Sequence, residues 1–201
     1  MSSTRQDSNT TTQAASTEPL LVETDIVTHS AARNGLALLR IAFGVTFLWA
    51  FLDKLLALGF HTGYDDKGVL DRFGPAAWIN GGSPTEGFLS FGVPENNPFK
   101  GFYNGLAGSA AIDWLFMLGL LGIGLALTLG IGMRVAAASG AVLCLMMYAA
   151  SVPLENNPVI DDHIIGAIAV VVLALTLAGD TWGAGRAWAR TNLVRRFPVL
   201  R

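Results

Sequence analysis

Four long apolar segments constrain this 201-residue chain more than any other feature. A hydrocarbon layer of about 30 Å needs roughly 20 apolar residues in a helix, because each residue adds about 1.5 Å. Only 14% of the residues are charged, against about 25% in an ordinary soluble domain. We therefore predict an all-α fold, a four-helix transmembrane bundle over residues 33–180. Its spans are expected at about 36–58, 112–131, 133–152 and 159–180.

The fourth segment has the shortest uninterrupted apolar run, at residues 164–178. That run alone is too short for a comfortable crossing of the membrane. Asn157 before Pro158 is a helix start signal, because proline suits the first helical position. We therefore expect this helix to begin near Pro158 and to extend outward through Asp161–His163.

Three long stretches lie outside the spans. Residues 1–32 are rich in Ser, Thr and Gln and lack the apolar run of a signal peptide, so we predict a disordered tail. Residues 59–110 form a long extracytoplasmic connection with many aromatic residues, and we expect short helices there, lying on the outer face of the bundle. Residues 181–201 carry five arginines and several aromatic residues, which is typical of a basic interfacial segment on anionic lipid.

The distribution of charge predicts the orientation. Lysine and arginine in short loops favour the cytoplasmic side. Arg134 lies between the second and third spans, and the arginines of 181–201 follow the fourth, whereas 59–110 is more acidic than basic and 152–159 has no basic residue. We therefore expect a multi-pass protein of the cell (plasma) membrane with both termini in the cytoplasm. Its partner is the lipid bilayer, and the net charge of −2 suggests no nucleic acid.

Charged residues inside the first span are candidates for a functional site, because charge in a membrane segment is costly. Arg40 is expected near the inner surface, and Asp53 and Lys54 near the outer one. Their side chains could simply reach toward the nearer interface. Alternatively, they could bind an anion or a quinone headgroup. The ligand-binding candidates are Arg40, Trp49, Asp53 and Lys54.

A second cluster, Glu155–His163, precedes the fourth span. Asp161 and Asp162 could cap a helix, since its N-terminus favours negative charge. They could instead form a catalytic group with His163, which exchanges protons near neutral pH. His163 could also ligate a metal together with Asp162 or His61. The candidate catalytic residues are His163, Asp162 and Asp161, and no haem, flavin or metal site is evident, which leaves quinone as the expected cofactor.

Two further patterns concern packing and turns. Small residues such as Gly119, Gly122 and Gly124 predict close approach of helices within the membrane. The tetrapeptide Glu-Asn-Asn-Pro occurs at 95–98 and again at 155–158. Shared turn chemistry explains this repeat, although two outer helix starts could also frame one pocket.

Several of these motifs together resemble the DoxX family, over roughly residues 33–197. The residues that carry the resemblance are Leu39-Arg40, Gly44, Phe47 and Asp53-Lys54-Leu55 in the first span, the stretches 81–91 and 124–134, Asn157-Pro158 with Asp161–His163, and the ending 183–188.

This resemblance implies a four-helix membrane fold with a redox-linked role. The DoxD branch of the family is the membrane subunit of thiosulfate:quinone oxidoreductase, and other relatives are associated with complexes that handle oxidative stress. Many members carry an acidic residue early in the second helix, where this chain has Asp113. The expected function is a membrane subunit that links electron transfer to quinone, with partner proteins that supply other cofactors. The alternatives are a non-catalytic anchor for partner oxidoreductases and a small-molecule carrier.

Overall fold

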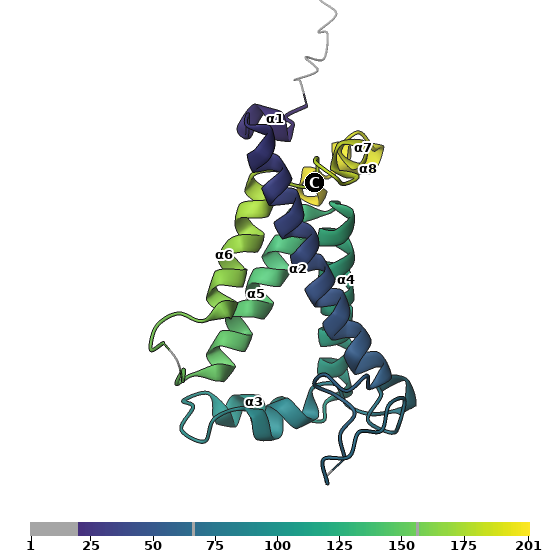
Figure 1. Ribbon diagram of the computed structural model, residues 1–201, viewed down its shortest axis with the longest axis vertical. Coiled ribbons are helices and arrows are strands. Elements are labelled where there is room, and N and C mark those ends of the chain that lie inside the picture. The colour runs from purple at the N-terminus through teal and green to yellow at the C-terminus, as the bar shows by residue number, and fades with distance from the viewer. Residues whose placement is uncertain (1–19, 66, 156) are drawn as a thin grey trace, which may run out of the picture.

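The computed structural model describes residues 20–65, 67–155 and 157–201, and the described part of the chain is helical, without a strand of a sheet (Figure 1). Residues 1–19, which belong to the expected tail, lie outside the described residues. In chain order the helices are α1 (Glu23–Ile26), α2 (Ser30–Leu56), η1 (Trp78–Asn80), η2 (Phe88–Gly92), α3 (Lys100–Leu106), α4 (Ala110–Leu129), α5 (Met133–Ser151), α6 (Asp162–Leu175), α7 (Gly185–Ala189), α8 (Asn192–Arg196) and η3 (Pro198–Leu200).

Three of these helices, α2, α4 and α5, are long and apolar enough to cross a membrane. Large apolar side chains project from them into the surroundings, among them Leu38, Leu115 and Val142. Burial of such groups in lipid removes apolar surface from water. The chain is therefore a multi-pass membrane protein that contacts lipid. At 14 residues and about 1.5 Å per residue, α6 is only about 21 Å long.

The first long helix is longer at its start than predicted. It begins at Ser30, and α1 precedes it, so residues 23–26 and 30–32 are helical rather than disordered. It ends at Leu56 instead of Leu58, because Ala57 adopts a left-handed conformation (φ 53°) that stops the helix.

The predicted bounds of the fourth helix were wrong at both ends. It begins at Asp162, because the Asp161 side chain accepts a hydrogen bond from the Ile164 backbone N–H and so caps the helix. Pro158 lies in the preceding loop rather than at the first helical position. At the other end α6 stops at Leu175, and Leu177 has a positive φ of 55° that no helix tolerates.

The helices α4 and α5 form the expected tight hairpin. Gly130 (φ 73°) ends α4, and Gly132 (φ 60°) precedes α5. Glycine adopts this left-handed geometry without the steric cost that other residues incur. The direction of the chain therefore reverses within three residues.

The long helices pack mainly as two pairs, α2 with α4 and α5 with α6. Gly44 of α2 lies against Thr128 of α4, and Gly124 of α4 against Leu48 of α2. A Cβ atom at Gly44 would lie 2.4 Å from Thr128 Oγ1, so glycine permits this contact between backbones. Gly122, in contrast, has no atom within 4 Å of such a position, so only part of the glycine pattern reflects packing.

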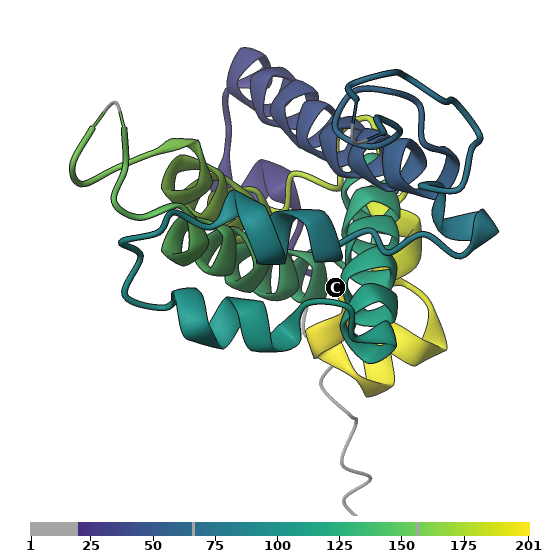
Figure 2. The ribbon, with the colours of Figure 1, turned by 90° about the horizontal axis from the view of Figure 1, so that it is seen from below.

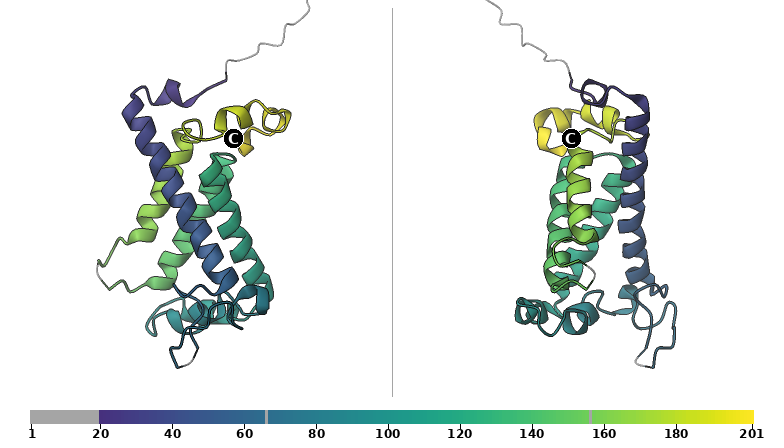
Figure 3. Two further views of the ribbon diagram at one scale, coloured as in Figure 1. Left: turned by 45° about the vertical axis from the view of Figure 1, so that its right-hand side comes forward. Right: turned by 60° about the vertical axis from the view of Figure 1, so that its left-hand side comes forward.

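The two pairs are close together at one end of the molecule and diverge toward the other (Figures 1 and 3). The terminal end carries α1, α7, α8 and η3. The loop end carries residues 57–65 and 67–109, with α3 lying across the ends of the long helices (Figure 2). The main buried cluster, which includes Leu127, Met133 and Leu173, lies toward the terminal end.

Candidate functional site

Arg40 lies in a closed site at the terminal end. Its side chain is 0% exposed, and its guanidinium donates five hydrogen bonds, which use all five of its N–H groups. The acceptors are the backbone carbonyls of Leu127 and Thr128 at the end of α4 and of Ala178, Thr181 and Trp182 after α6. Carbonyls in the last turn of a helix have no N–H donor within that helix, and the Arg40 guanidinium donates to two of them at the end of α4.

The structure therefore places Arg40 in a structural role and not in the ligand site that the sequence predicted. No donor remains for an anion or a quinone, and the side chain neither reaches the surface nor lines the cavity described below. Its positive charge lies against carbonyls at the C-terminal end of α4 and in the loop after α6, an arrangement that a helical wheel of the first span alone does not reveal.

A second buried group extends the terminal end around Asp180. The Asp180 carboxylate accepts hydrogen bonds from the Glu23 backbone N–H (3.0 Å) and from Arg201 Nη2 (3.3 Å). The Thr181 hydroxyl donates to the Glu23 carboxylate. Burial raises the pKa of Glu23, Thr181 opposes this shift, and the negative charge of Asp180 adds to it. These contacts attach α1 and the C-terminal segment to the loop after α6.

Asp53 and Trp49 also have structural positions. Asp53 is 1% exposed, and its two carboxylate oxygens accept hydrogen bonds from the backbone N–H groups of Phe60 (3.0 Å) and His61 (2.9 Å). Trp49 is exposed on the outer face of α2 and packs edge-on against Phe60. Asp53 thus fixes the turn after α2, and neither side chain is placed to hold a ligand in the cavity.

The group of Asp161, Asp162 and His163 lies at the N-terminus of α6. His163 Nδ1 is 2.7 Å from Asp161 Oδ2, and Asp162 Oδ1 is 3.6 Å from the same nitrogen. Partial burial alone would raise the pKa of Asp161, but the hydrogen bonds with His163 and the Ile164 N–H outweigh it and lower that pKa. Both Asp161 oxygens are thus already engaged, and the side chain of Asp162 is 92% exposed. This geometry fits helix capping.

A cavity of about 700 Å³ lies at the loop end, where the helix pairs diverge. Such a volume is typical of small-molecule sites. The walls come from α2, α4 and α5 and from loop residues within three stretches, which are 61–64, then 76, 83–85 and 87–89, and finally 103 and 106.

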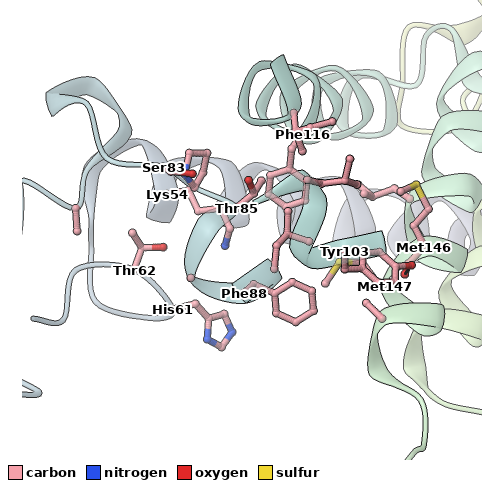
Figure 4. A pocket seen from close by; sticks show the side chains of 18 of the residues that line it. Lys54, His61, Thr62, Ser83, Thr85, Phe88, Tyr103, Phe116, Met146 and Met147 are labelled. Atoms are coloured by element: carbon pink, nitrogen blue, oxygen red, sulfur yellow. Dashed lines mark hydrogen bonds between the residues drawn. The ribbon is translucent and has the colours of Figure 1, made fainter. Parts of the chain in front are cut away.

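One side of the cavity is polar. Figure 4 shows Lys54, His61, Thr62 and Ser83 on this side. The hydroxyls of Ser83 and Thr85 donate to Asp113 Oδ1 at 2.9 Å and 2.6 Å, so their protons point away from a ligand. Lys54 and His61 are therefore the ionisable hydrogen-bond donors that line this side of the cavity.

The other side is apolar and is formed mainly by α5. Met146 and Met147 line it, together with Phe116 of α4 and Tyr103 of α3 (Figure 4). The Tyr103 hydroxyl donates to the Met146 carbonyl at 2.8 Å, which attaches α3 to α5. Burial raises the pKa of Tyr103, so the phenol stays protonated at neutral pH.

No protein-family model, curated protein or solved structure matches this chain. The chemistry of the site therefore has to follow from its own residues.

The structure brings together only some of the expected site residues. Lys54 lines the cavity, while Arg40 lies at the opposite end and Asp161–His163 contribute nothing to the lining. Sequence analysis missed Ser83, Thr85 and Tyr103. A signal existed for the first two, because their loop leads to Asp113, the single acid of the second span.

Proposed function

We propose that this protein is the integral membrane subunit of a redox complex, similar to DoxX and DoxD proteins, that links electron transfer to membrane quinone. The electrons would come from thiosulfate or from a reaction that counters oxidative stress, through a partner protein. The observation that carries this proposal is the loop-end cavity. A quinone ring accepts hydrogen bonds at its carbonyls, and Lys54 and His61 are donors at the polar side.

The apolar side of the cavity supports the same ligand class. Phe116, Met146 and Met147 offer a surface for a ring or an isoprenoid tail. His61 is exposed and sits at the polar side, so it is placed to exchange protons between water and a bound headgroup. We accordingly propose that Lys54 and His61 form the catalytic group, which the sequence analysis had expected at His163, Asp161 and Asp162.

We further propose that α6 is the fourth crossing of a four-helix transmembrane bundle. Exposed Ile165, Ile168 and Leu175 suit contact with lipid. The loop after α6, which is bound to Arg40, would complete the passage through the interface. The arginine-rich terminal end would face the cytoplasm of the cell, and the loop end would face outward.

Orientation can be measured by cysteine labelling on intact cells. In a Cys144→Ala background, Val69→Cys marks the exposed loop end and Ala187→Cys the exposed terminal end. A membrane-impermeant maleimide should label the first and spare the second until the cells are opened. The reverse pattern would overturn the proposed orientation.

A photoreactive azido-quinone tests the quinone site. Purified protein in nanodiscs should be labelled on the segments 83–88 or 143–150, and excess decylubiquinone should prevent the labelling. Lys54→Met should weaken labelling several-fold, whereas His163→Ala should leave it unchanged. Labelling that decylubiquinone does not reduce would refute a specific quinone site. A thiosulfate:quinone assay with and without candidate partners then identifies the donor.

The second candidate function is a membrane anchor for soluble oxidoreductases. Its support is the exposed aromatic surface of the loop end, where Phe91 is 88% exposed and Phe99 and Phe102 are also exposed. Aromatic side chains are enriched in protein interfaces. Mild cross-linking followed by capture should recover one specific oxidoreductase, and Phe91→Ser should abolish this recovery. Unchanged recovery from the variant would exclude this surface as the docking site.

A further inference from the structure

We propose that the loop-end cavity binds an amphipathic acid, with the negatively charged headgroup on Lys54 and the apolar chain against α5. The assignment is a long-chain carboxylate of the kind that lipids release. It rests on the cavity itself and does not require a redox role, so it goes beyond quinone binding.

The first observation is the state of the Lys54 ammonium. Among the described residues, no carboxylate lies within 4.0 Å of its nitrogen, and none accepts a hydrogen bond from it. Its neighbour Asp53 is occupied by the N–H groups of Phe60 and His61. The aromatic ring of Phe116 lies 6.0 Å away, at the limit of a cation–π contact. A half-buried cation with so little compensation favours a ligand that brings a negative charge.

The second observation is the balance of donors and acceptors on the polar side. Lys54 offers donors only, and His61 and Thr62 offer further N–H or O–H groups. The Asp113 carboxylate does not line the cavity, because the hydroxyls of Ser83 and Thr85 stand in front of it. A carboxylate headgroup accepts hydrogen bonds only, so it complements these groups. Charge-assisted hydrogen bonds of this type are about twice as strong as neutral ones.

The third observation is the separation of the two sides. Lys54 and His61 lie at one side of the space, and Met146 and Met147 at the other (Figure 4). A small inorganic anion would leave the apolar side empty. A neutral hydrocarbon would leave the ammonium without a counter-charge. A chain that carries its acid at one end satisfies both sides at once.

Photo-crosslinking provides the test. The probe is dodecanoate with a diazirine near its methyl end, added to the purified full-length protein in phosphatidylcholine nanodiscs. It should label α5 around Met146 and Met147. Unlabelled dodecanoate should compete, while methyl dodecanoate, which has no charge, should compete at least tenfold less well.

The matched variants are Lys54→Met and Lys67→Met. Lys67 is exposed and lies outside the cavity lining. Lys54→Met should lower the apparent affinity at least tenfold, and Lys67→Met should not change it. Removal of a half-buried, unpaired charge should not unfold the protein, and thermal unfolding of the variant verifies this. Met147→Trp, which fills the apolar side, should also reduce labelling.

Three results would overturn the proposal. These are equal competition by the methyl ester, unchanged affinity in Lys54→Met, and competition by dodecyl phosphate but not by dodecanoate. The last would assign the site to lipid phosphates. Quinone binding is measured separately with the azido-quinone. If the protein binds dodecanoate but no quinone, only the redox proposal is refuted.

Discussion

The cations Arg40 and Lys54 have opposite surroundings at the two ends of the bundle. At the terminal end, Arg40 is fully buried and every one of its N–H groups has a carbonyl partner. At the loop end, Lys54 faces a cavity of about 700 Å³ without an anionic partner among the described residues. Both cations belong to the same helix, α2, and both looked alike as charges in an apolar segment.

The difference shows that two charges that look alike in the sequence of one helix have different surroundings, because Arg40 has all its hydrogen bonds satisfied and Lys54 faces a cavity. Arg40, with all its N–H groups bonded, holds the end of α4 and the loop after α6 together. A lysine beside a cavity is free to bind. The comparison predicts that changes at the terminal end alter stability alone, whereas changes around the loop-end cavity also alter ligand binding.

Substitution of Arg40 should have the largest effect. Arg40→Met leaves five carbonyls without this donor, and a buried acceptor left unsatisfied costs about 1–3 kcal/mol, so we expect the free energy of unfolding to fall by about 3–5 kcal/mol. Arg40→Lys should rescue little, because lysine has three donors and lacks the planar fork of arginine. Denaturant unfolding in nanodiscs measures this, with the exposed Arg196→Met as control. A loss below about 1 kcal/mol would contradict the structural role of Arg40.

The close contact between α2 and α4 provides the next test. Gly44→Ala places a methyl group against the Thr128 backbone N, 2.7 Å away, which cannot move without shifting α4. Overpacking of this kind costs about 1–3 kcal/mol. Gly122→Ala, which meets no atom within 4 Å, should be neutral or slightly stabilising. Equal effects of the two substitutions on thermal unfolding would contradict the observed α2–α4 interface.

At the loop end, Asn97 links the loop to α5. Its amide donates to the carbonyls of Ala149, Ala150 and Val152, and its side-chain oxygen accepts from the Phe99 N–H. Asn97→Ala should lower stability by about 1–2 kcal/mol. It should also weaken ligand capture, because α3 is held over the cavity. The exposed Asn96→Ala is the control, and a variant with normal stability and normal binding would show that this contact is dispensable.

The smallest expected effect concerns acid and the α6 cap. The pKa of Asp161 is lower in the folded chain than in the unfolded one, so ionised Asp161 stabilises the fold above the unfolded pKa of about 3.9. This contribution is lost as the pH falls through the lower, folded pKa. Asp161→Asn keeps an amide cap and does not titrate, so its stability should fall less than that of the wild type as the pH is lowered from 6 through the folded pKa of Asp161. Asp162→Asn, whose exposed side chain caps nothing, should behave as the wild type, and identical pH profiles for all three proteins would exclude this role of Asp161.

The sequence contained enough information for the membrane class and for three helices of spanning length. Apolar length sets these features, and Gly130 and Gly132 mark the hairpin directly. No glycine in the sequence indicates the end of α6, because the residue with a positive φ after this helix is Leu177. The repeated tetrapeptide reflects shared turn chemistry, since Asn97 and Asn157 each accept a hydrogen bond from the N–H two residues later.

The sites depended on contacts that a local pattern does not contain. The acceptors around Arg40 lie 87 to 142 residues further along the chain. The cavity combines α2, α4, α5 and three stretches of the loop, and no periodicity relates them. The charge pattern predicts both Lys54 and Arg40 as candidates. Only the packing shows that Lys54 lines the cavity and that Arg40 does not.

The five carbonyl contacts of Arg40 also bear on how this protein is made. The last partner, Trp182, follows Arg40 by 142 residues, which a ribosome adds in roughly 7–28 s at about 5–20 residues per second. During that interval α2 carries an arginine whose charge is expensive in hydrocarbon. We therefore expect the insertion machinery to retain α2 until the final helix emerges, and ribosome-stalled chains that end before residue 182 should remain cross-linked to it.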